Sequence, residues 1–223
     1  MVGKNKLKKY SEAATYQNII RPERDELFKG WPGKGQWNSH FFGNDQEIVV
    51  ELGAGKGETS LMLAQKYPDK NFIAVDIKVD RLLKGAKEAV EMGLKNILFL
   101  RIQIEHIEYA FMAEEISEIW ITFPDPFPTE RRRKKRMTSH KFIQSYQKVL
   151  KKNGLIHLKT DSTLMFDFTR EVLEELSLPL NYETRDVYAE ENPPEDVVML
   201  QTYYEKKWLE EGKKIKYLNF NLN

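Results

Sequence analysis

The sequence has no cysteine among its 223 residues. Disulfides, thiolate-bound zinc, iron–sulfur clusters and every reaction through a cysteine nucleophile are therefore excluded. It also has no run approaching the roughly 20 apolar residues of a membrane span, and its lysine-rich start lacks the apolar core of a secretory signal. These absences predict a cytoplasmic protein without a membrane segment.

The chain also has almost no net charge. Lys and Arg number 35 against 34 Asp and Glu, which gives a formal net charge of +1. The basic residues are unevenly placed, however. Six of them follow one another at 131–136 and are called the basic run below, and Lys4, Lys6, Lys8 and Lys9 lie close together near the N-terminus. Taken alone, such a run is as often a solvated surface as a binding face. A local basic face is predicted, and its use stays open at this point.

The chain lacks internal repeats and a linker rich in Pro, Gly or Ser, so we expect one domain. Residues 1–45 carry turn signals and little periodicity apart from a short helical stretch near 8–19, and we interpret them as an N-terminal arm packed on a domain of residues 46–223. From Glu47 short β-branched or aromatic runs alternate with amphipathic stretches, which is typical of an α/β fold with a mostly parallel central sheet flanked by helices.

The expected strands are residues 48–52, 71–75, 97–101, 118–122 and 154–159, with two more near 182–187 and 214–220. The last strands allow an antiparallel pairing near the C-terminus. The expected helices are residues 61–67, 81–91, 141–151 and a segment around Val172, with Ser162 as one N-cap and Thr138 or Ser139 as another.

A glycine-rich turn follows the first of the five strands, in the order Glu51, Gly53, Gly55, Gly57. The spacing fits neither a dinucleotide fingerprint nor a phosphate-binding P-loop. It resembles motif I of the class I S-adenosylmethionine-dependent methyltransferases, in which the acidic residue suits a cationic methionine group. A turn with glycines for geometry alone is the alternative.

Two polar residues end the next strands of the predicted sheet. Asp76 follows the glycines by about 20 residues and can accept hydrogen bonds from both ribose hydroxyls of a nucleoside. Gln103 can contact an adenine edge through its amide. Both positions fit a cofactor crevice at the carboxyl ends of the strands.

The loop after the 118–122 strand reads Phe123-Pro124-Asp125-Pro126-Phe127-Pro128. Three prolines stiffen it and are expected to hold Asp125 at the mouth of the crevice. This proline loop is the first of four segments that resemble motifs of the bacterial tRNA (guanine-N7)-methyltransferases and occur in the same order. The other three are the basic run, His157-Leu-Lys-Thr-Asp-Ser162 and Thr202-Tyr-Tyr-Glu205. The resemblance covers residues 41–217, although Thr129 stands where that family has Lys and Gln103 where it often has an acid.

The resemblance implies a Rossmann-like class I methyltransferase that transfers a methyl group from S-adenosylmethionine to N7 of a guanine in tRNA, within the variable loop. Asp125 is then the catalytic candidate. The residues it implies for the cofactor are Glu51, Gly53, Gly55, Asp76, Gln103 and Asp125, and those for the tRNA are Thr129, Asp161, Thr202, Glu205, Arg131, Lys134, Lys135 and Arg136.

Two alternatives remain at this stage. The chain can be a class I methyltransferase of a non-RNA substrate, or an RNA-binding module with a vestigial cofactor fold. The absence of cysteine excludes methylation of cytosine C5. No metal, no membrane and no obligate protein partner is expected, and the predicted assembly is a monomer or a homodimer.

Overall fold

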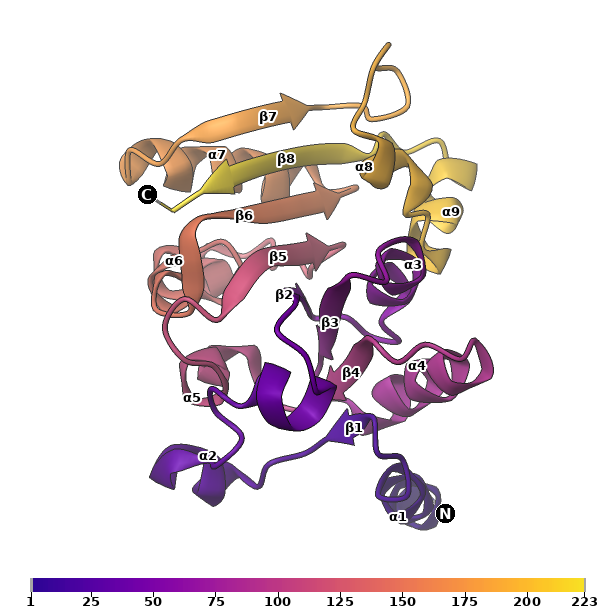
Figure 1. Cartoon of the computed structure of the whole chain (residues 1–223). Coiled ribbons are helices and arrows are strands. Elements are labelled where there is room, and N and C mark those ends of the chain that lie inside the picture. The colour runs from indigo at the N-terminus through magenta and orange to yellow at the C-terminus, as the bar shows by residue number, and fades with distance from the viewer. Residues whose placement is uncertain (1, 223) are drawn as a thin grey trace.

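The protein is described by a computed structural model that covers the backbone of residues 2–222 and the side chains of residues 8–222. Within this part of the chain an eight-stranded sheet has the order β1-β4-β3-β2-β5-β6-β8-β7 (Figure 1). Strand β8 is antiparallel to β6 and β7, and the other pairings are parallel. The strands are β1 (Ile19–Ile20), β2 (Glu47–Leu52), β3 (Lys70–Val75), β4 (Ile97–Leu100), β5 (Ile116–Thr122), β6 (Leu150–Thr160), β7 (Leu180–Thr184) and β8 (Lys216–Asn221).

Helices cover both faces of the sheet. The α-helices are α1 (Val2–Ala13), α2 (Arg24–Gly30), α3 (Glu58–Lys66), α4 (Val79–Glu91), α5 (Ile107–Ala110), α6 (His140–Gln147), α7 (Thr163–Glu175), α8 (Glu195–Met199) and α9 (Tyr203–Glu210). A π-helical turn, η1, spans Trp37–Phe42, and 3-10 turns span Ile104–His106 (η2) and Glu130–Lys135 (η3). No helix in the described part of the chain is long and apolar enough to cross a membrane.

The alternation of side chains along β2 divides the interior into two cores. Ile48, Val50 and Leu52 pack in the core under α5, α6 and α7, whereas Val49 packs in the core under α3 and α4. Strands buried on both faces are expected where helices cover both sides of a parallel sheet. The predicted α/β class, with its antiparallel C-terminal strand, is confirmed.

The order of the strands fixes where a ligand can bind. The chain runs from β2 to β3 and β4 in one direction and then places β5 and β6 on the other side of β2. At such a reversal the loops after two neighbouring strands diverge and leave a crevice at their carboxyl ends. The glycine turn after β2 and the proline loop after β5 flank this crevice.

The N-terminal residues contribute to the sheet and to the core. The predicted helical stretch near 8–19 is wrong in its bounds, because α1 ends at Ala13 and Ile19 begins β1. The carbonyl groups of Asn18 and Ile20 accept hydrogen bonds from Phe99 and Arg101, which adds β1 to the edge of β4. The division into an arm and a domain stays a prediction.

The helix predicted at 141–151 ends early, and the strand predicted at 154–159 begins early. Helix α6 stops at Gln147, and Leu150 already pairs with Ile116 of β5. Val149 and Leu150 are buried, as residues on the inner face of a helix would also be, so their apolar pattern could not locate the boundary. Ser162 caps α7 as predicted, with its hydroxyl accepting from the Met165 amide at 3.2 Å. Ser139 precedes α6, but its hydroxyl donates to the Lys134 carbonyl instead of capping the helix.

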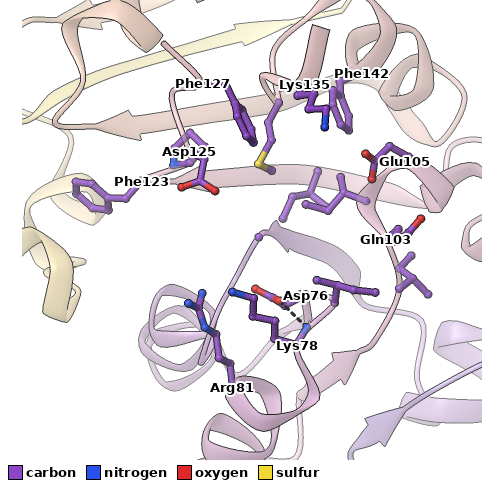
Figure 2. A pocket seen from close by; sticks show the side chains of 17 residues that line it. Asp76, Lys78, Arg81, Gln103, Glu105, Phe123, Asp125, Phe127, Lys135 and Phe142 are labelled. Carbon is purple, nitrogen blue, oxygen red and sulfur yellow. Dashed lines mark hydrogen bonds between the residues drawn. The ribbon is translucent and has the colours of Figure 1, made fainter. Parts of the chain in front are cut away.

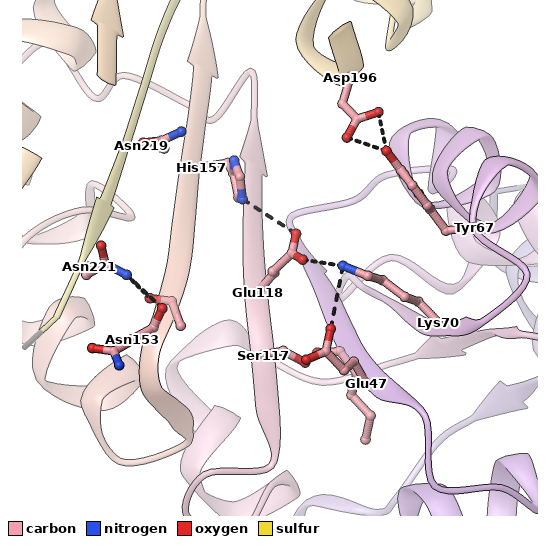
Figure 3. A network of polar contacts seen from close by, with 12 residues as sticks. Glu47, Tyr67, Lys70, Ser117, Glu118, Asn153, His157, Asp196, Asn219 and Asn221 are labelled. Carbon is pink, nitrogen blue, oxygen red and sulfur yellow. Dashed lines mark hydrogen bonds and ion pairs between the residues drawn. The ribbon is translucent and has the colours of Figure 1, made fainter. Parts of the chain in front are cut away.

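A polar network joins the strands on the α3 side of the sheet (Figure 3). Glu118 of β5 accepts a hydrogen bond from the Lys70 ammonium at 2.7 Å and faces the His157 ring at 3.6 Å. Burial opposes its ionisation, but His157 and Lys70 lower the pKa of Glu118 to about 2. This network ties β3, β5 and β6 together beneath α8.

Candidate active site

A cavity of about 310 Å³ opens at the carboxyl ends of β2, β3, β4 and β5. Its volume lies within the range of small-molecule sites, about 300–1,000 Å³. In Figure 2 Asp76, Lys78 and Arg81 lie on one side of it, and Asp125, Phe127 and Lys135 lie on the other. The remaining lining residues are Leu52, Gly53, Ile77, Ile102, Gln103, Ile104, Glu105, Phe123, Pro124, Met137 and Phe142.

The glycine turn passes from β2 into α3 with Gly53, Gly55 and Gly57 at φ of 72°, 60° and 74°. These left-handed conformations are unfavourable for residues with a Cβ. A Cβ on Gly57 would also lie 3.0 Å from both Ala74 and Phe99, whereas one on Gly55 would meet nothing. At Gly57 the glycine is therefore required by close packing against β3 and β4, whereas at Gly55 there is open space next to the turn.

Asp76 is held in place by the backbone of both neighbouring loops. Its Oδ2 accepts from the Gly55 amide at 2.9 Å and its Oδ1 from the Lys78 amide at 2.8 Å. The side chain is buried but lines the cavity. Each carboxylate oxygen accepts more than one hydrogen bond, so both can still receive a ligand hydroxyl.

Glu51 does not line the cavity. One of its oxygens accepts from the amide and hydroxyl of Ser60 at 3.0 and 2.7 Å, and the other accepts from the Thr122 hydroxyl at 2.9 Å. Burial raises the pKa of Glu51, and these hydrogen bonds offset part of that effect. In the structure Glu51 fixes the start of α3 to β5, and its contact with a cofactor stays a prediction.

The proline loop presents Asp125 at the cavity mouth. Phe123 and Phe127, on either side of it, have φ of 49° and 40°, which is an uncommon conformation for an aromatic residue. The Phe123 amide donates to the Lys159 carbonyl at 2.8 Å, which keeps the start of the loop at the end of β6. Strained backbone of this kind clusters at functional sites, where the surroundings enforce it.

Residues 131–135 of the basic run lie in η3, and Arg136 follows it. Some of these side chains are exposed, and others are bonded within the protein. Arg131, Lys134 and Lys135 are exposed, and Lys135 lines the cavity. Thr129, which precedes η3, is also exposed and makes no side-chain capping bond. These residues can face a ligand that approaches the cavity from outside.

Arg136 is a correction to the sequence prediction. Its side chain is 5 % exposed, and its guanidinium donates to the Pro126 and Phe127 carbonyls at 3.0 and 3.1 Å. A group buried in this way is not available to bind a phosphate on the surface. The charge pattern alone could not reveal this, because all six bases look alike in the sequence.

The contact of Glu205 with tRNA stays a prediction, and the structure shows the residue engaged within the protein. It is fully buried, and its Oε1 pairs with Lys159 at 2.6 Å and accepts from the Tyr188 hydroxyl at 2.7 Å. Burial raises the pKa of Glu205 and lowers that of Lys159, while their pairing offsets part of each effect. Lys159 also donates to the carbonyls of Val197 and Leu200, so the pair fastens α8 and α9 to the end of β6.

The other residues predicted to contact tRNA lie outside the cavity lining. Thr202 is buried and caps α9, where its hydroxyl accepts from the Glu205 amide at 3.3 Å. Asp161 follows β6 and pairs with Lys213 at 3.3 Å. The structure therefore brings Asp76, Gln103, Asp125 and Lys135 together, and it leaves Asp161 and Thr202 on the α9 side.

Gly85 supports the glycine turn by packing, and the sequence analysis did not identify it. It lies inside α4, where a Cβ would fall 1.8 Å from the Lys56 carbonyl oxygen. Its absent side chain lets α4 approach the glycine turn. A lone glycine within an amphipathic helix was the available signal, since it costs about 1 kcal/mol of helix stability and indicates a packing reason.

The strand order, the glycine turn and the strand-end acid together define a Rossmann-like enzyme of the class I methyltransferase type. Solved methyltransferases share the fold. The 16S rRNA methyltransferase KamB aligns with a TM-score of 0.62 at 16 % identity, over 84 % of this chain and 91 % of its own. An antibiotic-related methyltransferase aligns with a TM-score of 0.60 at 16 % identity, over 92 % and 96 %.

A family model described as "Putative methyltransferase" matches residues 45–218. A tRNA (guanine-N(7)-)-methyltransferase of Christiangramia forsetii is 48 % identical over the full length of both chains. Those of Bacteroides thetaiotaomicron and Clostridioides difficile are 45 % and 36 % identical, over 99 % and 88 % of this chain and 87 % of each relative. The chain belongs to the tRNA (guanine-N7)-methyltransferase family.

Proposed function

We propose that the protein transfers a methyl group from S-adenosylmethionine to N7 of a guanine in tRNA. The observation that carries this is the position of Asp125, which stands across the cavity from Asp76 and beside exposed bases of the basic run (Figure 2). Relatives of nearly the same length carry this activity in their names. A tRNA substrate also agrees with a cytoplasmic enzyme.

The residues of the cavity fit the methyl donor. Asp76 offers carboxylate oxygens to a ribose, Gly53 brings backbone to the ligand, and Gln103 faces the cavity with an amide. S-adenosylmethionine supplies an electrophilic methyl group. The described part of the chain has no cluster of His, Cys, Asp and Glu side chains suited to a metal ion.

The acceptor atom explains what Asp125 has to do. N7 of guanine carries an in-plane lone pair and no proton, so the nucleophile needs no general base. Aligning the reacting atoms can supply about 7–11 kcal/mol of the acceleration. Asp125 would accept hydrogen bonds from the N–H groups of guanine, orient the ring and stabilise the positive charge that develops on it.

The exposed Lys and Arg side chains of η3 would provide contacts to phosphates. Phosphate contacts fix the position of the RNA without reading its sequence. Turning a base out of a folded tRNA costs a few kcal/mol, which such contacts can offset. Thr202 and Asp161, on the α9 side, are proposed as the second wall of the acceptor site.

The direct test combines labelled S-adenosylmethionine, the purified protein and bulk tRNA that lacks modifications, followed by identification of the labelled nucleoside. We expect 7-methylguanosine. Label in another nucleoside, or label in protein but not RNA, would overturn the proposal.

Calorimetry with the demethylated product of S-adenosylmethionine tests the part of the cavity that is proposed to bind the methyl donor. Asp76→Asn should weaken binding at least about tenfold, because hydrogen bonds to a charged group contribute about 1.5–3 kcal/mol each. Asp80→Asn is the matched control, since Asp80 is an exposed acid of α4 outside the cavity lining. Equal affinities for the two variants would remove Asp76 from the site.

A further inference from the structure

The buried guanidinium of Arg136 contacts the loop that carries Asp125. Its Nε donates to the Pro126 carbonyl at 3.0 Å and its terminal nitrogen donates to the Phe127 carbonyl at 3.1 Å. Pro126 follows Asp125 directly. A planar guanidinium presents its donors in a fixed fork, so two adjacent carbonyls held by one fork have little freedom to move.

The loop has few means of holding this shape by itself. Pro124, Pro126 and Pro128 lack the amide hydrogen, so they donate no backbone hydrogen bond. Phe123 and Phe127 are in the left-handed region, at φ of 49° and 40°. Such conformations persist only where the surrounding structure enforces them. On the side of Phe127, the Arg136 fork provides that enforcement.

Arg136 itself rests on a rigid base. Its guanidinium carbon lies 4.5 Å from the centre of the Phe168 ring, and Phe168 is buried in α7. The next two residues are also fixed, because the Met137 carbonyl accepts from the Tyr146 hydroxyl at 2.9 Å and the Thr138 hydroxyl lies 2.7 Å from that of Thr169. No described carboxylate lies within ion-pair distance of Arg136. Its charge is therefore directed to loop carbonyls and an aromatic face.

We propose that Arg136 is a positioning residue that holds the proline loop so that Asp125 stays at the cavity mouth. This inference rests on the proposed function, because it assigns to Arg136 an effect on methyl transfer through Asp125. It separates Arg136 from its five neighbours in the basic run. Those that are exposed act on the RNA, and Arg136 acts on the protein.

The first test compares Arg136→Lys with the wild-type enzyme. Lysine keeps the charge but cannot bond two carbonyls as a fork, so kcat for tRNA methylation should fall about 10- to 100-fold, as expected for a displaced catalytic group. The KM for tRNA, its dependence on salt and the affinity for the demethylated product should change less than about twofold. Arg185→Lys is the matched control, because Arg185 also lies over a phenylalanine of α7, Phe166 at 4.9 Å, away from the loop.

The second test uses Arg136→Ala and the added ion ethylguanidinium. An ion that enters the vacated space should restore a measurable part of kcat in this variant and none in Asp125→Ala. A rise in the KM for tRNA with a flattened salt dependence and unchanged kcat would identify a phosphate contact and overturn the proposal. So would wild-type kcat in Arg136→Lys.

The positioning role of Arg136 and the proposed function can be refuted independently of each other. If the wild-type enzyme forms 7-methylguanosine and Arg136→Lys keeps its kcat, the positioning role is wrong and the proposed function stands. If the wild-type enzyme forms none, the function is wrong whatever Arg136 does. If a variant no longer binds the demethylated product, its cavity is disturbed, and the rescue experiment, which returns a guanidinium group to the vacated space, then decides.

Discussion

The carboxylate of Asp125 differs from those of Asp76 and Glu51 in having no bonding partner within the described part of the chain. It makes no hydrogen bond or ion pair with any side chain that the structure describes, whereas Asp76 accepts two backbone amides and Glu51 bonds two hydroxyls. An exposed, unpaired carboxylate on a constrained loop contributes little to folding. The proposed contact of Asp125 with the substrate would account for its position.

Asp125→Asn should therefore separate activity from stability. We expect kcat to fall about 10²- to 10³-fold, the loss typical of removing one group that stabilises transition-state charge. The melting temperature and the affinity for the demethylated product should stay within error of wild type, because no intramolecular bond is lost. Near wild-type turnover would show that the carboxylate has no part in the reaction.

At the scale of elements, the glycine turn and α4 are fitted to each other through Gly85. Alanine is the better helix former by about 1 kcal/mol, so Gly85→Ala would stabilise an isolated helix. In this protein the Cβ of an alanine at position 85 would lie 1.8 Å from the Lys56 carbonyl oxygen. This contact cannot be relieved by a change of side-chain rotamer, because the oxygen belongs to the backbone. The helix or the turn has to move.

We expect Gly85→Ala to destabilise the protein by about 1–3 kcal/mol, the usual cost of overpacking, and to weaken binding of the demethylated product. Denaturant unfolding and calorimetry measure the two effects. Lys84→Ala, one residue away on the exposed side of α4, is the control and should change neither. A more stable Gly85→Ala protein would mean that the turn yields without cost.

The basic run is the element that should respond to salt. Each lost phosphate contact reduces the slope of log affinity against log salt by up to about one unit. Arg131→Ala with Lys134→Ala should raise the KM for tRNA and flatten that slope by up to about two units, with binding of the demethylated product unchanged. Lys151→Ala with Lys152→Ala, two exposed bases at the start of β6, is the control and should leave the slope as it is. An unchanged slope in the first pair would leave these bases as solvated surface.

The features that could be predicted from the sequence are those that depend on residues close together in the chain. The turn glycines, the strand-end position of Asp76 and the cap at Ser162 follow from short patterns with a local physical cause. The strand β1 could not be predicted, because its two residues are extended only through pairing with β4. The burial of Arg136 and Glu205 was missed for the same reason, since their partners are set by tertiary packing.

At the scale of the whole molecule, the charge network around Glu118 determines how the fold responds to acid. His157 and Lys70 lower the pKa of Glu118 to about 2, although burial opposes its ionisation (Figure 3). A carboxyl whose pKa is lowered by folding stabilises the protein above its unfolded pKa of about 4.3. That contribution is lost as the pH falls from about 4 through 2.

Glu118→Gln should lower the free energy of unfolding at pH 6, because it leaves Lys70 and His157 facing a neutral amide. The difference from wild type should shrink as the pH falls from about 4 towards 2, where about half of the native carboxyl groups are protonated. Urea unfolding at several pH values measures this. A constant difference across that range would show that Glu118 contributes by packing and not by charge.

Strand β8 has a consequence for how the protein is made. All residues that line the cavity lie before residue 143, yet β8, which pairs with both β6 and β7, spans residues 216–221. During translation the donor site can therefore form while one edge of the long strand β6 still has no partner. An unpaired strand edge invites pairing with other chains. Until β8 has been synthesised, that edge of β6 remains open to pairing with other chains.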